Sequence, residues 1–325
     1  MTVFIIRRLL QAIVVVFLMS LIVFFGVNVI GDPVDMLINP EADQAEIERT
    51  IRALGLDKPI HEQYLFFLKG VASGDFGKSF IFGEPALKLI LHHMPATIEL
   101  ALVSLVMAIV LGIPLGLYAG LFPDQRISRA IMAGSILGFS LPTFWVGLMM
   151  IMLFAVYLGW LPSTGRGDMA EFLGIRSSLW TRDGLSHLFM PALNLALTNI
   201  SLVIRLTRAG VREAMHQDYI KFARAKGLTT RRVVGVHLMK NILIPIVTVL
   251  GLEFGNLLAF SVVTETIFAW PGMGKLLIDS LLQLDRPVVV AYLMIIVLFF
   301  VIINLVVDIL YSVLDPRVRL RDQGT

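Results

Sequence analysis

Two acidic side chains stand inside long apolar stretches of the sequence, where an ionised group is costly. Glu253 lies in the middle of the stretch 242–264, and Asp308 lies near the end of the stretch 288–312. A charge in hydrocarbon costs at least about 2.5–3.5 kcal/mol, so such a residue usually faces a cavity, a partner or another helix. Glu253 therefore has two open interpretations: a place on a translocation path, or a bond to a neighbouring helix. Asp308 lies within about one turn of the end of its stretch, which favours the second interpretation.

Groups for catalysis, phosphate binding or metal binding are not assembled in this sequence. The segment 72–79 ends in Gly-Lys-Ser but begins with alanine where a phosphate-binding loop needs glycine, and 269–276 has the same fault and ends in leucine. His92 and His93 are adjacent, whereas helical metal pairs sit four residues apart. The chain contains no cysteine and no nucleophile elbow. These patterns predict a protein that is not an enzyme and holds no metal.

The composition explains why reactive groups are few. Of 325 residues, 57% are hydrophobic and 16% are charged, and the mean hydropathy is +0.83. Soluble domains are about 45–50% apolar and about 25% charged, so a soluble enzyme and a disordered regulator are both excluded. Six apolar stretches reach the length of about 20 residues that crosses a bilayer. They are 9–30, 98–122, 131–158, 187–206, 242–264 and 288–312. The sequence therefore predicts an all-α polytopic membrane protein with six transmembrane helices.

The positions of the charges set the orientation. Cytoplasmic loops of membrane proteins are enriched in Lys and Arg. With the N-terminus inside, the inner segments carry 16 Lys and Arg against five Asp and Glu, whereas the outer segments carry 11 against 16, leaving out Glu99, Glu253 and Asp308 within the spans. Those inner segments are 1–8, 123–130, 205–241 and 313–325. The first apolar stretch is too long for a signal-peptide core of about 7–15 residues, so it is interpreted as a retained span.

The two longer outer loops are predicted to differ from each other. The first carries apolar residues at helical spacing over 43–54 and 61–71, which predicts two short amphipathic helices. The second, 159–186, is rich in glycine, serine and charge and is expected to be irregular. Glu99 stands at an outer span boundary and is expected to be exposed to water.

Small residues and prolines recur within the spans. Gly112, Gly116 and Gly120 fall on one helix face, where another helix can approach closely, and general packing within the bundle is the favoured interpretation. Pro114 and Pro142 remove helical hydrogen bonds, which is tolerated where neighbours or a cavity satisfy the backbone.

The inner segment 205–241 is basic, lacks proline and predicts a helix–turn–helix around Gly227. A short helix followed by one that returns to the membrane forms a protrusion that suits the groove of a partner protein. A basic loop in contact with anionic lipid is the alternative. Charge alone does not separate the two.

Short motifs that follow one another along nearly the whole chain resemble those of one family. Lys221-Phe222-Ala223 fills the place of Glu-Ala-Ala in the coupling loop of ABC-importer permeases, and 223–228 reads Ala-Arg-Ala-Lys-Gly-Leu, as in the peptide branch. The general Ile-x-Leu-Pro element is absent. Further motifs stand at 74–79, 140–147, 265–274 and 314–319. The chain resembles the B-type permease of dipeptide and oligopeptide ABC importers, the DppB/OppB family.

The resemblance implies a type I ABC importer permease fold with a large outer loop after the first helix. It implies three parts: 1–97, the first helix and a periplasmic amphipathic loop; 98–312, the permease core with a coupling loop at about 207–241; and 313–325, a cytoplasmic tail. The protein would lie in the bacterial inner membrane with both termini in the cytoplasm. Its partners would be a second, C-type permease, two ATPase subunits, an extracytoplasmic solute-binding protein and membrane lipid, but no nucleic acid. ATP and Mg²⁺ would bind the ATPase subunits, and this chain would hold no cofactor.

The resemblance also points to individual residues. Coupling to the ATPase is expected from Asp218, Tyr219, Lys221, Phe222, Ala223, Arg224, Ala225, Lys226, Gly227 and Leu228. The outer-loop motif comprises Glu265, Phe268, Trp270, Pro271, Gly272 and Gly274, and its loop is expected to reach towards substrate in a docked binding protein. Candidates for lining the translocation path are Asn194, Asn199, Glu253 and Asn256, each of which could equally form a helix–helix hydrogen bond.

The expected function is half of an ATP-driven import pathway for dipeptides or short oligopeptides, working by alternating access. The same class of importer moves glutathione, nickel chelates and oligosaccharides, so the substrate stays open. A self-contained secondary transporter would need inverted repeats or a chain of buried titratable groups, and a membrane enzyme would need clustered catalytic groups. The sequence shows neither pattern, and copurification of ATPase subunits separates these alternatives.

Overall fold

The computed structural model describes residues 2–27 and 57–314, which form two compact units. The first unit comprises Met1–Thr97 and Pro271–Ile302, and the second comprises Ile98–Trp270 and Ile303–Thr325. The helix predicted for 43–54 and residues 315–319 of the C-terminal motif lie outside the described residues.

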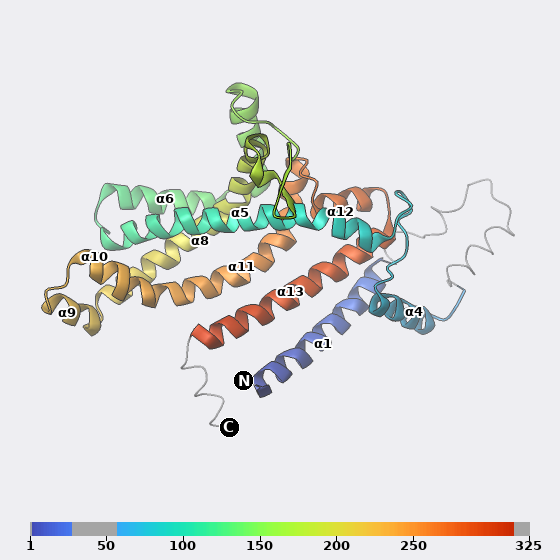
Figure 1. Ribbon diagram of the computed structural model, residues 1–325, viewed down its shortest axis with the longest axis horizontal. Helices are drawn as coiled ribbons and strands as arrows, with labels where there is room; N and C mark the ends of the chain where they lie inside the picture. Colours follow the sequence, from blue (N-terminus) through green and yellow to red (C-terminus); the bar gives the residue numbers. More distant parts are fainter. Residues whose placement is uncertain (1, 28–56, 315–325) are drawn as a thin grey trace. The chain divides into compact units, whose positions relative to one another are not determined.

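Long helices dominate the structure (Figure 1). Among the described residues, five spans are long and apolar enough to cross a membrane. They are Ile6–Gly26, Ala86–Leu121, Arg182–Met215, Thr230–Ile267 and Arg286–Ile309. The corresponding elements are α1 (Thr2–Val27), α5 (Ala86–Leu121), α8 (Arg182–Met215), α10 with η3 and α11 (Thr230–Arg232, Val233–Leu238 and Met239–Ile267) and α13 (Arg286–Leu314). The fold is therefore that of a polytopic helical membrane protein.

The predicted third span, 131–158, is not one helix. It consists of α6 (Arg126–Ser140) and α7 (Thr143–Met150), and the π-helix η1 (Ile151–Tyr157) continues α7. The two halves are bent by 106° and amount to a sixth span only if the pair is counted as one. Leu141 at the bend is extended, with φ −81° and ψ 136°. A proline disfavours helical backbone in the residue before it, so Pro142 accounts for the break.

The shorter elements correct one loop prediction and confirm another. The helix expected at 61–71 is α4 (Ile60–Ser73). The loop 159–186, expected to be irregular, contains an antiparallel hairpin of β1 (Ala170–Phe172) and β2 (Ile175–Ser177), followed by the 3₁₀ turn η2 (Ser178–Trp180). Leu173 and Gly174 join the strands with φ of +52° and +79°, as in a type I′ turn. The remaining described helices are α9 (Asp218–Ala225) and α12 (Met273–Leu282).

The core of the second unit forms around α8, which contacts α6, α7 and α11. The three glycines of α5 lie against it, as their spacing predicted. A Cβ added at Gly112, Gly116 or Gly120 would lie 2.6–2.7 Å from side-chain atoms of α8. The absence of side chains at these three positions of α5 therefore lets the two helices approach closely.

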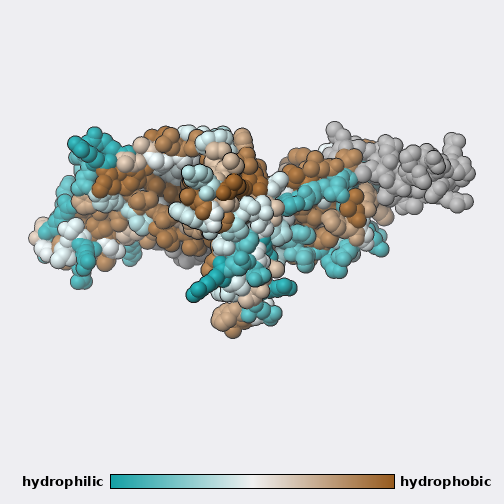
Figure 2. Space-filling view, turned by 90° about the horizontal axis from the view of Figure 1, so that it is seen from above, coloured by the Kyte–Doolittle hydropathy of each residue, from teal (hydrophilic) through white to brown (hydrophobic). Residues whose placement is uncertain are grey.

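The first unit holds α1 against α4 and α13 through a small apolar cluster. Val23 and Met294 are its buried members, and Phe67 packs against them. Ser20 Oγ and Tyr64 Oη share a hydrogen bond of 2.8 Å, which ties α1 to α4. Hydrophobic surface covers much of the helices, and hydrophilic surface lies at the end that carries α9 and α10 as well as over other parts of this face (Figure 2). A bilayer or a second membrane subunit would cover such an apolar surface.

Candidate functional site

The short helix α9 is held to the second unit by one narrow apolar face. Ile220 and Ala223 are buried in the main core cluster, which also contains Val233 and Leu238 of η3. The three-residue spacing of the two anchors places them on the same side of the helix. The same core cluster includes residues of α8 and α11, and α9 itself contacts α8 and η3, so it is packed against the second unit.

The opposite face of α9 presents aromatic and charged side chains to the surroundings. Phe222 is 62% exposed and Tyr219 is 39% exposed. Lys226 Nζ lies 4.6 Å from the centroid of the Phe222 ring. Lys221 Nζ donates a hydrogen bond of 2.8 Å to Asp218 Oδ1, and this bond, together with the positive charge, lowers the pKa of Asp218. A large exposed aromatic residue ringed by charges is typical of a protein contact.

The turn after α9 reverses the chain as the sequence predicts. Gly227 has φ of +73°, a left-handed conformation that glycine adopts without strain. Its N–H donates to the Arg224 carbonyl at 2.9 Å, and Leu228 N–H donates to the Ala223 carbonyl at 3.3 Å. The chain then enters Thr230–Ile267, a continuous helical stretch of 38 residues. The predicted helix–turn–helix is confirmed, and Arg224, Ala225 and Lys226 lie exposed at its tip.

The four candidates for a translocation path fall into two pairs. Asn194 and Asn199 are buried on α8, and Asn194 Nδ2 donates to Thr264 Oγ1 of α11 at 3.2 Å. Their Oδ1 atoms are buried without a hydrogen-bond partner among the described residues. Glu253 and Asn256 on α11 are only partly buried, and Asn256 Nδ2 donates to Glu253 Oε1 at 3.3 Å. Asn194 thus makes the helix–helix bond that was one of its two interpretations.

The outer-loop motif is mostly interior. Glu265, Phe268 and Trp270 are at most 1% exposed, and Ser261 Oγ donates to Glu265 Oε1 at 2.9 Å. The expected reach towards a docked protein therefore cannot come from these three side chains. Pro271, Gly272 and Gly274 belong to the first unit, where Gly272 precedes α12 and Met273 N–H donates to Thr97 Oγ1 at 2.8 Å.

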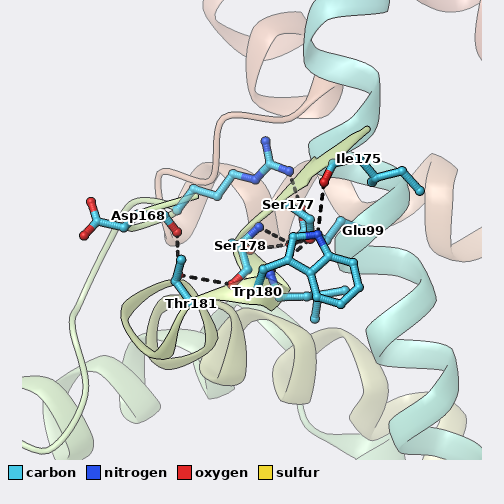
Figure 3. A network of polar contacts seen from close by, with 9 residues as sticks. Glu99, Asp168, Ile175, Ser177, Ser178, Trp180 and Thr181 are labelled. Carbon is cyan, nitrogen blue, oxygen red and sulfur yellow. Dashed lines mark hydrogen bonds and ion pairs between the residues drawn. The ribbon is translucent and has the colours of Figure 1, made fainter. Parts of the chain in front are cut away.

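Glu99 forms a buried polar network, which contradicts the expectation that it faces water. Only 7% of the residue is exposed. Its Oε1 accepts hydrogen bonds of 3.0 Å from Ser177 Oγ and from the N–H of Ser178, and it also accepts from Ser178 Oγ (Figure 3). Arg166 forms an ion pair with its Oε2, and the guanidinium lies 5.6 Å from the centroid of the Trp270 ring. We call Glu99, Arg166, Ser177 and Ser178 the Glu99 network.

The Gly-Asp-Phe-Gly-Lys-Ser segment at 74–79 also ends in a buried contact. Ser79 Oγ donates to Asp285 Oδ2, and Phe80 N–H donates to Asp285 Oδ1 at 3.1 Å. Ser79 and Asp285 are both buried. The hydroxyl that would serve a phosphate-binding loop is therefore engaged within the chain. In residues 2–27 and 57–314, no three His, Cys, Asp or Glu side chains are grouped so as to hold a metal ion.

Comparison with known proteins identifies the family. Residues 112–320 match the family described as "Binding-protein-dependent transport system inner membrane component", and residues 1–101 match its N-terminal companion. The chain belongs to this permease family. The permease is 38% identical to the di/tripeptide transport system permease protein DppB of Pseudomonas aeruginosa (strain UCBPP-PA14), over 97% of this chain and 98% of that protein. The peptide-type resemblance seen in the motifs is thereby confirmed.

The permease is also similar to two further relatives and to one solved structure. It is 38% identical to the oligopeptide transport system permease protein AppB of Bacillus subtilis (strain 168), over 98% of this chain and all of that protein. It is 36% identical to the glutathione transport system permease protein GsiC of Escherichia coli (strain K12), over 97% and 98% of the two chains. A chain in "Inward facing conformations of the MetNI methionine ABC transporter: CY5 native crystal form" aligns with a TM-score of 0.53 and 18% identity, over 70% of the permease and 96% of that chain. This last likeness shows the fold alone.

Sequence reasoning missed the partners of the buried acids in the permease. Glu99 was noticed only as a boundary residue, and Asp285 was not noticed at all. A readable signal existed for the first, because an acid inside a candidate span calls for a cation, and Arg166 is one of few basic residues in the following outer loop. Nothing in the sequence joins Ser79 to Asp285, which the fold brings together across most of the chain.

Proposed function

We propose that the permease forms half of the translocation pathway of an ATP-driven peptide importer. Both termini would lie in the cytoplasm, as the charge distribution favours. The division into 1–97, 98–312 and a tail from 313 is part of the same proposal. The observation that carries it is the construction of α9, whose aromatic face is exposed while its anchors reach the core of the long helices.

The segment 218–228 would pass motion from an ATPase subunit to the spans. A helix with two exposed aromatic residues suits a groove in a soluble partner. Because α9 contacts α8 and η3, and η3 continues directly into α11, a displacement of α9 would be carried to both long helices. ATP would then shift the permease between its two access states through contacts that differ between those states.

The partners would supply what this chain lacks. Two ATPase subunits would bind ATP and Mg²⁺, a C-type permease would form the other half of the pathway, and a solute-binding protein would deliver substrate. The permease itself would catalyse no reaction and hold no cofactor. Glu253 and Asn256 are the better candidates for lining the pathway, because they are only partly buried. Asn194 instead would tie α8 to α11 through its bond to Thr264.

Short peptides are the proposed substrate, because the permease is similar along its full length to permeases named for di- and tripeptides and for oligopeptides. Glutathione is the second candidate, supported by the similarity to a glutathione permease. Glutathione is itself a tripeptide, so the two candidates agree in size. Nickel chelates and oligosaccharides remain alternatives within the same class of importer, and a secondary transporter is the alternative outside it.

The deciding experiment is ATP hydrolysis by the complex purified with its coexpressed neighbouring subunits and reconstituted in lipid. The cognate binding protein is added with a dipeptide, with glutathione or alone. Stimulation that needs both the binding protein and the dipeptide supports the proposal. Stimulation with glutathione only would replace the substrate, and failure of any ATPase subunit to copurify would overturn the importer assignment.

A variant of α9 tests the coupling role directly. Phe222→Ala removes the most exposed aromatic residue of the helix and leaves its anchors in place, so we expect the ATPase subunits to be lost during purification while the permease remains folded. Phe172→Ala, at another exposed phenylalanine on the hairpin, is the matched control and should retain them. Gly227→Pro should likewise abolish coupled hydrolysis, because proline does not reach φ of +73°. Normal coupled hydrolysis in both Phe222→Ala and Gly227→Pro would overturn the assignment.

A further inference from the structure

A basic cavity lies beside the last turns of α8. It has a volume of about 520 Å³, within the range of about 300–1,000 Å³ typical of ligand pockets. Its lining comes almost entirely from one helix, with a single residue from α6. The lining residues are Met132, Arg205, Arg208, Ala209, Arg212 and His216.

The basic residues of the cavity form a stripe along one helix face. Arg205, Arg208, Arg212 and His216 follow one another at intervals of three, four and four residues, which is the spacing of one side of an α-helix. None of the described lining residues is acidic. Glu213, which follows Arg212 directly, is exposed and is not among the residues that line the cavity. The cavity therefore concentrates positive charge without a balancing carboxylate in its lining.

One arginine of the stripe has a buried donor that a ligand could satisfy. Arg208 Nε is buried and has no hydrogen-bond partner among the described residues. A buried donor without a partner is rare and costly, because it loses water without gaining another acceptor. A guanidinium offers several N–H donors in a fixed plane, which matches the oxygens of a phosphate group. An anion in the cavity would give this nitrogen its missing acceptor.

The surroundings of the cavity are apolar on the side of α6. The Arg205 guanidinium stacks over the Phe139 ring at 4.5 Å from its centroid, which fixes the head of that side chain. Ile136, Leu137 and Phe139 are more than half exposed on α6. A ligand with an anionic head and apolar tails would thus meet basic groups in the cavity and apolar groups along the helix.

The cavity also lies at a suitable depth. The apolar part of this span ends near residue 206, whereas α8 continues to Met215. A helix of 34 residues is about 50 Å long, well beyond the hydrocarbon core of about 30 Å. Arg205 therefore stands at the edge of the hydrocarbon, and the later basic residues stand at the level of the lipid headgroups.

We propose that this cavity binds the phosphate group of an anionic phospholipid in the cytoplasmic leaflet. Basic pockets of membrane helices at that face of the bilayer are suited to acidic headgroups. The proposal takes its leaflet from the orientation proposed above, but the binding itself depends on neither transport nor ATP. A free phosphate ion would offer the same oxygens without the apolar tails.

The test measures the lipid retained by the full complex. The complex is purified, equilibrated with mixed micelles of equal parts phosphatidylglycerol and phosphatidylcholine, and its bound lipids are quantified by mass spectrometry. We expect the wild type to be enriched in phosphatidylglycerol. Arg208→Gln/Arg212→Gln should reduce that enrichment by about tenfold, because charge-assisted bonds to the phosphate are lost. Arg231→Gln/Arg232→Gln removes the same charge from exposed residues outside the cavity and should leave the enrichment unchanged.

Further variants distinguish loss of the binding site from loss of folding or of charge. Arg212→Gln alone changes an exposed side chain and tests the cavity if the double variant does not fold. Arg208→Lys/Arg212→Lys keeps the charge and should recover part of the enrichment. Excess inorganic phosphate should not displace the lipid, and displacement would reassign the cavity to free phosphate.

Equal enrichment in the wild type and in Arg208→Gln/Arg212→Gln would overturn the proposal in either of two forms. With all subunits retained, it would show that the cavity holds no lipid. With a copurifying subunit lost, it would show that an acidic segment of a partner protein fills the cavity. Neither result bears on the importer assignment, which the ATPase experiment tests separately.

Discussion

The α9 helix differs in exposure from a second region, which comprises the Glu99 network and the outer-loop motif at 265–274. On α9, Phe222 is 62% exposed, and the ion pair of Asp218 with Lys221 lies in the open. In the other region, Phe268 is 1% exposed, and the ion pair of Glu99 with Arg166 is buried. Both regions contain short motifs through which the sequence resembles peptide-importer permeases.

This difference in exposure separates two roles that the side chains of a sequence motif can have. Where the side chains of a motif are exposed and only a narrow face holds them, their identities serve something outside the chain. Where they are buried and bonded, their identities serve the packing of the chain itself. By this criterion we propose the 218–228 segment as a surface for a partner, whereas Glu265, Phe268 and Trp270 are buried in the second unit. Four predictions test this division, from the largest expected effect to the smallest.

Breaking the buried ion pair should have the largest effect. Glu99→Ala leaves the Arg166 guanidinium buried without its counter-ion, and removing one partner of a buried pair costs about 3–5 kcal/mol. The loss is measured as a lower dodecyl sulphate fraction at half-unfolding in mixed micelles. Glu171→Ala, at an exposed glutamate of the hairpin, is the control and should change stability by less than about 0.5 kcal/mol. Equal stability of both variants would show that the Glu99 network does not hold the permease together.

The same substitution at two phenylalanines compares the regions directly. Phe268→Ala should cost about 3 kcal/mol, because it empties a position in the cluster with Met150 and Met190. Phe222→Ala should leave the unfolding midpoint nearly unchanged, since the ring is already mostly exposed, while it releases the ATPase subunits. The comparison fails if Phe222→Ala destabilises the isolated permease as much as Phe268→Ala does.

Filling the close approach of α5 to α8 should have an intermediate effect. A Cβ at Gly116 would lie 2.6 Å from Thr207 Cβ and 2.7 Å from the Ile204 carbonyl oxygen, so Gly116→Ala should cost about 1–3 kcal/mol through overpacking. Gly134 on α6 has no described atom within 4 Å of such a Cβ, so Gly134→Ala should be neutral or stabilising by up to about 1 kcal/mol. Equal unfolding midpoints of Gly116→Ala and Gly134→Ala in the same assay would contradict the observed packing of α5 on α8.

Hydropathy and spacing predicted most of the fold. Five spans and the glycine face of α5 follow from local properties, and the bend at Pro142 was visible as a proline inside an apolar stretch. The full length of α5 could not be predicted, because residues 86–97 carry His92, His93 and Pro95 and fall below the hydropathy of a span. Helix ends outside the bilayer depend on packing, which a window of apolar residues does not report.

Only the local part of the candidate site could be predicted from the sequence. The helix–turn–helix around Gly227 is a local structure, so a glycine between two basic helical segments was sufficient to find it. Whether Phe222 or Phe268 is exposed depends on residues distant in the sequence, and both had looked like members of a motif. The stripe of Arg205, Arg208 and Arg212 was readable as a spacing, but it was counted only as inner charge, because its cavity also needs Met132 of α6.

The smallest effect is expected from the exposed ion pair of α9. Lys221 lowers the pKa of Asp218, so the ionised carboxylate stabilises the first turn of α9 above the ordinary pKa of 3.8, and this contribution is lost as the pH falls through the lowered value. Amide exchange in α9 should therefore quicken at low pH in the wild type and lose this dependence in Asp218→Asn, whereas Asp218→Glu should keep it. Surface pairs contribute little, so the unfolding midpoint of the whole permease should not move. If Asp218→Asn lowered that midpoint, the exposed region would be supporting the scaffold, and the division between the two regions would not hold.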